Sequence, residues 1–177
     1  MTKQVFKIDG AHSSLGFQVK HMMIAKVKGG FDTFHADLNL DPEDLTTAEI
    51  KFTIDVKSIN SNNDDRDTHL RSADFFDVEV FPNMTFVATD IKSTGDGEYK
   101  LTGDFTIKDI TKPVTFDVEY GGRGNNPWGV EVIAFEAEAK INRKDFGLTW
   151  NSALESGGVL VGDDIKLKVD IEANPEQ

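Results

Sequence analysis

Histidine is the residue of this sequence best suited to acid–base or metal chemistry, and there are four: His12, His21, His35 and His69. Zinc and copper sites usually draw ligands from closely spaced pairs, and the sequence contains neither an HxH nor an HExxH pattern. His12 and His21 lie nine residues apart, so a regular strand would place them on opposite faces. The spacing argues against a metal centre and favours hydrogen bonding at the mouth of a cavity.

Asp9, His12 and Ser13 have the residue types of a hydrolytic triad. Neighbouring residues of an extended strand point to opposite faces, so these three side chains are not expected to form a relay. The sequence also lacks the G-x-S-x-G nucleophile motif and the G-x-x-x-x-G-K-[ST] phosphate loop. We therefore expect no catalytic residues and a protein that is not an enzyme.

Aromatic residues are the other prominent group, with thirteen Phe, two Tyr and two Trp. Those predicted to face inward would surround an apolar ligand if the interior is hollow, and would be ordinary core if it is filled. The predicted apolar ligand-binding set is Phe17, Val19, Phe31, Phe34, Leu38, Phe52, Ile54, Phe75, Phe76, Phe86, Phe105, Phe116, Phe135 and Trp150. Four polar residues are predicted to meet the ligand's head group at the mouth, namely His12, Arg66, His69 and Asn151.

Apolar and polar residues alternate with a period of two along most of the chain, which predicts β-strands. The expected strands cover residues 4–9, 12–22, 27–40, 48–56, 84–91, 99–108, 113–120, 128–141, 159–161 and 165–172. Gly29-Gly30 is predicted to form a bulge, residues 162–164 a turn and residues 121–127 a loop. Charged residues occupy the alternate face, as in antiparallel sheets that have one face in solvent and the other on the core. About eight such strands predict an all-β, eight-stranded antiparallel barrel.

Residues 60–82 interrupt the alternation and predict a short helical insert. Asn62 or Asn63 can cap a helix whose first turn carries acidic residues, an arrangement that suits the helix dipole. Phe75 and Phe76 follow this helix. The insert is interpreted either as a lid over an apolar cavity or as a plug in the end of the barrel. No repeat or linker divides the chain, so residues 1–177 are expected to form a single domain.

The net charge of −12 would repel phosphate backbones and anionic headgroups, so nucleic-acid binding, stable binding to a membrane surface and stable membrane insertion are not expected. The absence of cysteine excludes disulfides and thiolate metal sites. The N-terminus has no apolar run of signal-peptide length, which predicts a cytoplasmic protein. A periplasmic or extracellular location is expected instead if a signal has been removed.

Several motifs in a fixed order carry a family resemblance. They are residues 8–13 with 17–21, residues 66–77 followed by Phe81-Pro82, residues 101–107 with 111–114, and residues 141–148 with 161–165. Together they resemble the YceI-like family of bacterial lipocalin-like proteins, which bind polyisoprenoids, and the match covers nearly the whole chain. Many members look periplasmic and carry a signal peptide, which is not expected for this chain from its first residues.

The resemblance implies a lipocalin-like barrel with a long apolar pocket. The implied ligand is a polyisoprenoid, an isoprenoid quinone precursor or a fatty-acid-like lipid, held for storage, transport or sequestration. The resemblance offers no catalytic residues, implies no cofactor beyond the bound lipid, and suggests a homodimer. Two alternatives stay open: an enzyme acting on an isoprenoid quinone at the barrel mouth, and a stress protein with a filled core.

Overall fold

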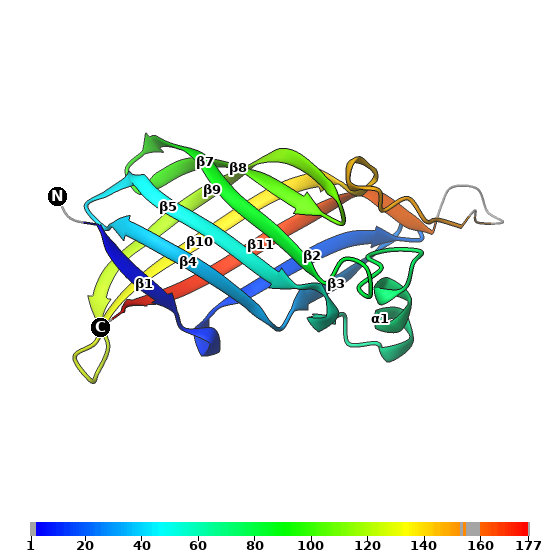
Figure 1. The fold of residues 1–177 in the computed structure, drawn as a ribbon, viewed down its shortest axis with the longest axis horizontal. Coiled ribbons are helices and arrows are strands. Elements are labelled where there is room, and N and C mark those ends of the chain that lie inside the picture. Colours follow the sequence, from blue (N-terminus) through cyan, green and yellow to red (C-terminus); the bar gives the residue numbers. More distant parts are fainter. Residues whose placement is uncertain (1–2, 153, 155–159, 177) are drawn as a thin grey trace.

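The computed structural model describes residues 3–152, 154 and 160–176. Its strands form a closed eight-stranded antiparallel barrel with one short helix at one end, so the fold class expected from the sequence is confirmed (Figure 1). The strands of the ring are β1 (Gln4–Ile8), β4 (Phe34–Asp41), β5 (Asp44–Asp55), β7 (Asn83–Gly95), β8 (Glu98–Ile107), β9 (Ile110–Asn125), β10 (Glu131–Asn142) and β11 (Val161–Pro175). In β1, Phe6 closes the ring by pairing with Leu38 of β4 and Pro175 of β11.

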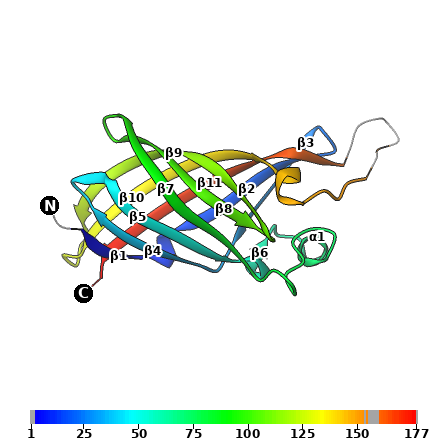
Figure 2. The ribbon, with the colours of Figure 1, turned by 45° about the horizontal axis from the view of Figure 1, so that its top comes forward.

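Three further strands extend the sheet beyond the ring: β2 (Ser14–His21), β3 (Ala25–Phe31) and β6 (Ile59–Asn60). β2 pairs with β11 and β3 pairs with β2, while β6 pairs only with the last two residues of β3. The 3₁₀ turns are η1 (Gly10–His12), η2 (Val56–Ser58) and η3 (Arg143–Phe146). The hairpin of β2 and β3 lies at the same end of the barrel as helix α1 (Asp64–Arg71), as Figures 1 and 2 show.

The alternation of residue types explains the register of the ring. The β10–β11 ladder runs without interruption from Ile133 opposite Ala173 to Asn142 opposite Asp164. Ile133 and Ala173 are fully buried, while Glu136 and Glu138 on the alternate face are exposed. A shift of one residue would turn the apolar set toward water, so the pattern fixes this pairing.

The expected strand over residues 27–40 is instead two strands. β3 ends at Phe31, and the next amide, of Asp32, donates a hydrogen bond to the Ser58 carbonyl of η2. The chain then enters β4, which pairs with β1 and β5 and not with β3. Periodicity continues across this break because both strands present apolar residues to the same interior.

The predicted bulge at Gly29-Gly30 was also wrong, because the β2–β3 register passes through it unbroken. A Cβ atom on Gly30 would lie 2.7 Å from the carbonyl oxygen of Leu15. Gly30 therefore allows two backbones to approach closely, while Gly29 leaves room for the Phe17 ring, which would lie 2.5 Å from a Cβ atom there.

The predicted turn at residues 162–164 lies within β11, where the register against β2 shifts between Val161 and Ile165. β9 continues to Asn125, through most of the segment expected to be a loop, and β10 begins only at Glu131. Of the strand expected at 159–161, residue 159 lies outside the described residues. The hairpin predicted around Asp96-Gly97 is confirmed, with Gly97 at a φ of +71°.

Helix α1 forms where the polar insert predicts it. The Asn63 side chain accepts a hydrogen bond from the Arg66 amide, and Asp64, Asp65 and Asp67 occupy the first turn. A capped, acidic N-terminus of this kind satisfies the first free amides and complements the helix dipole. No helix among the described residues is long and apolar enough to cross a membrane.

Candidate functional site

The barrel interior contains an apolar cavity of about 150 Å³. Its walls are carbon almost throughout, because Tyr99 contributes the only side-chain hydroxyl among the residues that line it. An apolar cavity of this size stays dry and accepts a molecule of roughly the size of benzene. The interior of the described part of the chain is therefore hollow, although the hollow is short compared with a long lipid tail.

Eight members of the predicted apolar set line this cavity, from seven strands: Phe31, Leu38, Phe52, Ile54, Phe86, Phe105, Phe116 and Phe135. The prediction missed a larger group of mostly aliphatic residues on the same face: Leu15, Gly16, Leu40, Leu45, Ala48, Ile50, Met84, Ile91, Tyr99, Leu101, Val118, Ala137, Leu167, Val169 and Ile171. Most of the missed residues share the period-two phase of the predicted ones, so following that phase along each strand would have found them.

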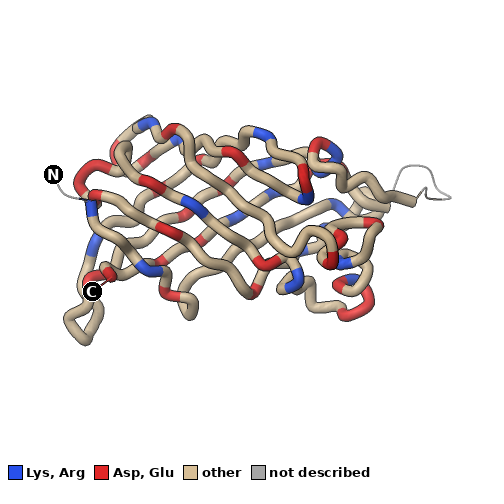
Figure 3. The backbone as a smooth tube through the Cα atoms, in the orientation of Figure 1, with Lys and Arg blue, Asp and Glu red and all other residues tan. Residues whose placement is uncertain are grey.

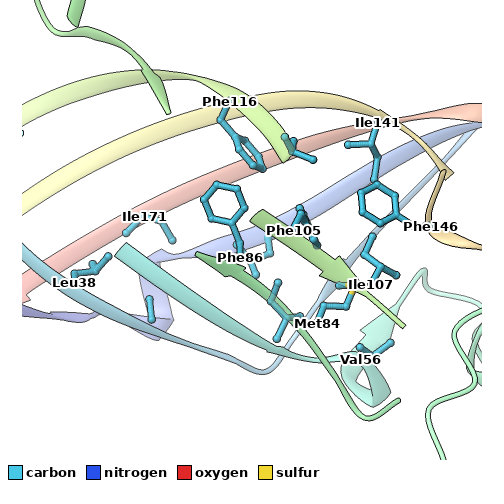
Figure 4. Close-up of a cluster of buried hydrophobic side chains, with 14 of the residues drawn as sticks. Leu38, Val56, Met84, Phe86, Phe105, Ile107, Phe116, Ile141, Phe146 and Ile171 are labelled. Carbon is cyan, nitrogen blue, oxygen red and sulfur yellow. The ribbon is translucent and has the colours of Figure 1, made fainter. Parts of the chain in front are cut away.

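Part of the interior is filled by side chains that touch one another. The ring of Phe86 lies 6.0 Å from that of Phe105 and 5.2 Å from that of Phe116, measured between centroids. Phe105 also packs against Phe146 of η3, at 5.9 Å. Figure 4 shows Phe146 beside Ile141 and Ile107, and none of these three residues lines the cavity. The barrel thus combines a packed core at one part of its interior with a cavity beside it.

Phe17 and Phe76 lie outside the cavity and connect it to the insert. The Phe31 ring, which does line the cavity, lies 5.8 Å from Phe17 and 6.1 Å from Phe76. Val19 and Phe34 do not line the cavity either. Phe76 is therefore separated from the cavity by a single side chain, that of Phe31.

Phe75, Trp150 and His69 form a compact cluster of their own. The His69 ring lies 5.1 Å from Phe75 and 4.5 Å from Trp150, in both cases edge to face. His69 Nε2 is hydrogen-bonded to Asp74 at 2.9 Å, and Phe75 is buried. The cluster joins the end of α1 to the segment after η3 and contributes no atoms to the cavity wall.

Two polar residues predicted to meet a head group bind the protein's own backbone. Arg66 donates from Nε to the Ser61 hydroxyl and from Nη2 to the Ser61 carbonyl, both at 2.8 Å. The Asn151 side chain donates to the Val161 carbonyl and accepts from the Val161 amide. Both side chains hold loops at the α1 end of the barrel, and their role toward a ligand stays a prediction.

Arg143 is a buried cation that the sequence reasoning did not single out. Its side chain is 2% exposed and donates to the carbonyls of Gly162, Leu148, Trp150 and Val161. Burial lowers the pKa of the guanidinium, and the Asp163 carboxylate 3.9 Å away partly opposes that change. Arg143 therefore ties the segment after η3 to the start of β11.

His12 lies in the 3₁₀ turn η1, so its expected position on a strand was wrong. The turn brings His12 Nδ1 within 2.8 Å of Asp9 Oδ2 and 3.7 Å of Glu172 Oε2. The hydrogen bond that His12 Nδ1 donates to the Asp9 carboxylate is the main cause that raises the pKa of His12. The Ser13 hydroxyl instead bonds the Glu172 backbone, so the three residue types of a triad are close together without forming a relay.

The YceI-like domain family matches residues 6–173 of the chain. A UPF0312 protein of Staphylococcus aureus strain MSSA476 is 45% identical over 168 residues, which cover 94% of this chain and 95% of the relative. Among solved structures, the YCEI protein of Campylobacter jejuni is 34% identical with a TM-score of 0.77, covering 89% of this chain and 90% of its own. BcnA of Burkholderia cenocepacia is 25% identical with a TM-score of 0.82, covering 93% and 98%.

A more distant structure has the same fold. It is described as a polyisoprenoid binding domain from Saccharophagus degradans implicated in plant cell wall breakdown. Its identity to this chain is 12% and its TM-score 0.73, with 98% of this chain and 99% of that domain covered.

Proposed function

Because the chain belongs to the YceI-like family, we propose that it binds a long-tailed amphiphile in the interior of its barrel. The ligand class is a polyisoprenoid, an isoprenoid quinone precursor or a fatty-acid-like lipid, and the role is storage, transport or sequestration without catalysis. The family match and the printed description of the Saccharophagus degradans domain support this ligand class.

The observation that carries the proposal is the apolar wall of the interior cavity. Each methylene group that leaves water for such a wall gains roughly 0.8 kcal/mol, and no charged side chain among the lining residues has to be desolvated. Affinity for a hydrocarbon tail then needs no specific polar contact. The head group would remain near an end of the barrel, where polar side chains are available.

A cavity of about 150 Å³ does not hold a tail of many carbons without rearrangement. Met84 is the flexible residue among the lining side chains, and it lies next to the Phe86 and Phe105 pair in Figure 4. Rotation of these side chains would join the cavity to the space that they fill. Lipid binding is therefore expected to be slower for long tails than for short ones.

The decisive experiment is extraction of the purified protein with organic solvent, followed by mass spectrometry of the extract and titration of the stripped protein with a fluorescent fatty acid. A co-purified isoprenoid or fatty chain and saturable uptake are expected. Ala137→Phe fills the cavity and should abolish uptake, because Ala137 lines it. Glu136→Phe adds the same ring to the exposed face of the same strand and should leave uptake unchanged.

A stripped, folded barrel that takes up neither an isoprenoid nor a fatty acid would overturn the proposal and favour a filled-core protein. Equal uptake by the Ala137→Phe variant would also contradict it, since the ligand would then lie elsewhere.

A further inference from the structure

The tip of the β2–β3 hairpin exposes three large apolar side chains in a row. Met22 is 44% exposed, Met23 58% and Ile24 88%, and Ile24 is the most exposed of the large hydrophobic residues described. The tip lies at the end of the barrel that carries α1 (Figures 1 and 2). Three adjacent apolar residues at a hairpin tip form a contiguous patch, unlike the isolated exposed residues common on soluble proteins.

The backbone conformation of this tip is strained for the residue types that occupy it. Met22 and Met23 both have positive φ values, of 54° and 64°, and the turn is closed by the Ile24 amide donating to the His21 carbonyl. Consecutive positive φ values favour Asn and Gly, and a bulky side chain there is strained. Two methionines at positions suited to Asn-Gly indicate that the side chains have a role outside the turn.

Lysines flank the apolar tip on a protein whose net charge is −12. Lys20 lies directly opposite Lys26 in the β2–β3 ladder, and both are exposed. Like charges opposite one another destabilise a strand pair unless an anion lies between them. Neither lysine takes part in an ion pair among the described residues, whereas the nearby Asp164 is paired with Lys140. Along the whole chain the 31 acidic residues outnumber the 19 Lys and Arg residues, and both kinds are spread over the strands (Figure 3).

We propose that the tip, defined as residues 20–26, docks the protein on a lipid bilayer with anionic headgroups. Met22, Met23 and Ile24 enter the apolar layer, and Lys20 and Lys26 meet the phosphates. A bilayer fits this patch better than a protein partner, because a stable protein interface buries about 800 Å² on each side and requires a shaped surface. Docking is reversible, since the net negative charge of the molecule opposes it.

The proposal goes beyond lipid binding in the barrel and does not depend on which ligand the barrel holds. It is tested with stripped protein and sedimented vesicles of equimolar phosphatidylglycerol and phosphatidylcholine, with pure phosphatidylcholine vesicles in parallel. The parent protein should bind the anionic vesicles more tightly. Met22→Asn/Met23→Gly should weaken that binding at least about tenfold by removing apolar insertion. Because Asn-Gly suits the turn, the melting temperature of this variant should equal or exceed that of the parent.

Lys20→Gln/Lys26→Gln should weaken binding to the anionic vesicles by about fivefold for each lysine and leave binding to phosphatidylcholine vesicles unchanged. The matched control is Trp128→Ser, because Trp128 is 83% exposed in the β9–β10 loop at the opposite end of the barrel (Figure 1). This control should bind as the parent does.

Equal binding of the parent to both vesicle types, or unchanged binding by the two tip variants, would overturn the proposal. Loss of binding in Trp128→Ser alone would overturn it as well, since the opposite end would then be the docking surface. Fluorescent fatty-acid uptake by the tip variants separates this result from a failure of lipid binding in the barrel.

Discussion

Arg143 shows how one side chain can organise the end of a barrel. Its guanidinium supplies hydrogen bonds to four backbone carbonyls of the irregular segment and of the start of β11. Arginine suits this position because its donors point outward in a fixed planar fork. The same segment carries Trp150, which contacts His69 and Phe75 near α1. A substitution of Arg143 should therefore also disturb the packing of the aromatic cluster of His69, Phe75 and Trp150.

Arg143→Gln is expected to lower the free energy of unfolding by about 3 kcal/mol, because buried carbonyls lose a charged donor. Chemical denaturation measures this loss. Arg123→Gln is the control, since Arg123 is 43% exposed and its ion pairs with Glu43 and Glu131 lie at the surface. Its effect should stay under about 1 kcal/mol. Equal losses for the two variants would contradict the structural role of Arg143.

His12 donates a hydrogen bond to Asp9, and this bond is the chief reason why the pKa of His12 should lie above its ordinary 6.5 and the pKa of Asp9 below 3.8. The contribution of His12 to stability is complete below pH 6.5 and is lost as pH rises through its raised pKa. The contribution of Asp9 is present above pH 3.8 and is lost as pH falls. The η1 turn is therefore most stable between these two values.

Titration of the His12 ring protons by NMR checks this assignment. Asp9→Asn should return the pKa of His12 toward 6.5, and Glu172→Gln should lower it less, because Glu172 acts only through its charge. An unchanged pKa in Asp9→Asn would show that the pair does not form in solution.

At the scale of elements, the insert between β6 and β7 was predicted to be either a plug or a lid, and the surroundings of its two phenylalanines bear on that choice. Phe75 is buried against His69 and Trp150, whereas Phe76 touches Phe31 at the cavity wall. The two adjacent phenylalanines thus have different environments. Burial of Phe75 suits a plug and contact of Phe76 with the cavity wall suits a lid, and the role of the insert stays a prediction.

Phe76→Ala should speed both uptake and release of a fluorescent fatty acid, because it removes the ring that covers Phe31. Phe76 is half-buried, so the variant should also lose about 1–2 kcal/mol of stability. Stopped-flow fluorescence measures the rates. Val80→Ala, at a position 63% exposed in the same insert, should leave them unchanged. Identical rates for Phe76→Ala and the parent would exclude the insert as the covering element.

The sequence predicted correctly those elements that are determined by residues close together in the chain, such as helix caps and tight turns. The Asn63 cap and the Asp96-Gly97 hairpin follow from neighbouring residues, and both are confirmed. The break between β3 and β4 could not be predicted in this way, because it depends on a hydrogen bond from Asp32 to Ser58, 26 positions away. His12 was misplaced since the Asp9 side chain caps a turn that alternation does not reveal.

Only part of the candidate site was predicted, because alternation shows which face of a strand is apolar but not which residues of that face line a cavity. Period-two alternation identifies a face of each strand, and large aromatic residues on that face were favoured over aliphatic ones. Leu40, Leu45 and Ile91 line the cavity although none is aromatic. Arg66 and Asn151 were predicted from residue type alone, and their partners are set by loop geometry that only the folded chain supplies.

At the scale of the whole molecule, the cavity makes stability depend on its contents. A ligand present at 100 times its dissociation constant adds about 2.7 kcal/mol to the free energy of unfolding. For a chain of this size, that corresponds to a rise in melting temperature of about 5–11 °C. Calorimetry of stripped and reloaded protein should show this difference. Coincident melting curves would mean that the barrel gains nothing from a bound lipid.

Beside the closed ring, the extension of the sheet has an edge that is largely unpaired. Among the described strands, β3 and β4 share no ladder, and only the two residues of β6 pair with the far edge of β3. The rest of that edge of β3 has no backbone ladder among the described strands, whereas each strand of the ring is paired on both sides. Phe31, the last residue of β3, lines the hollow interior, so a bound ligand would contact a strand that is paired along its full length on one side only.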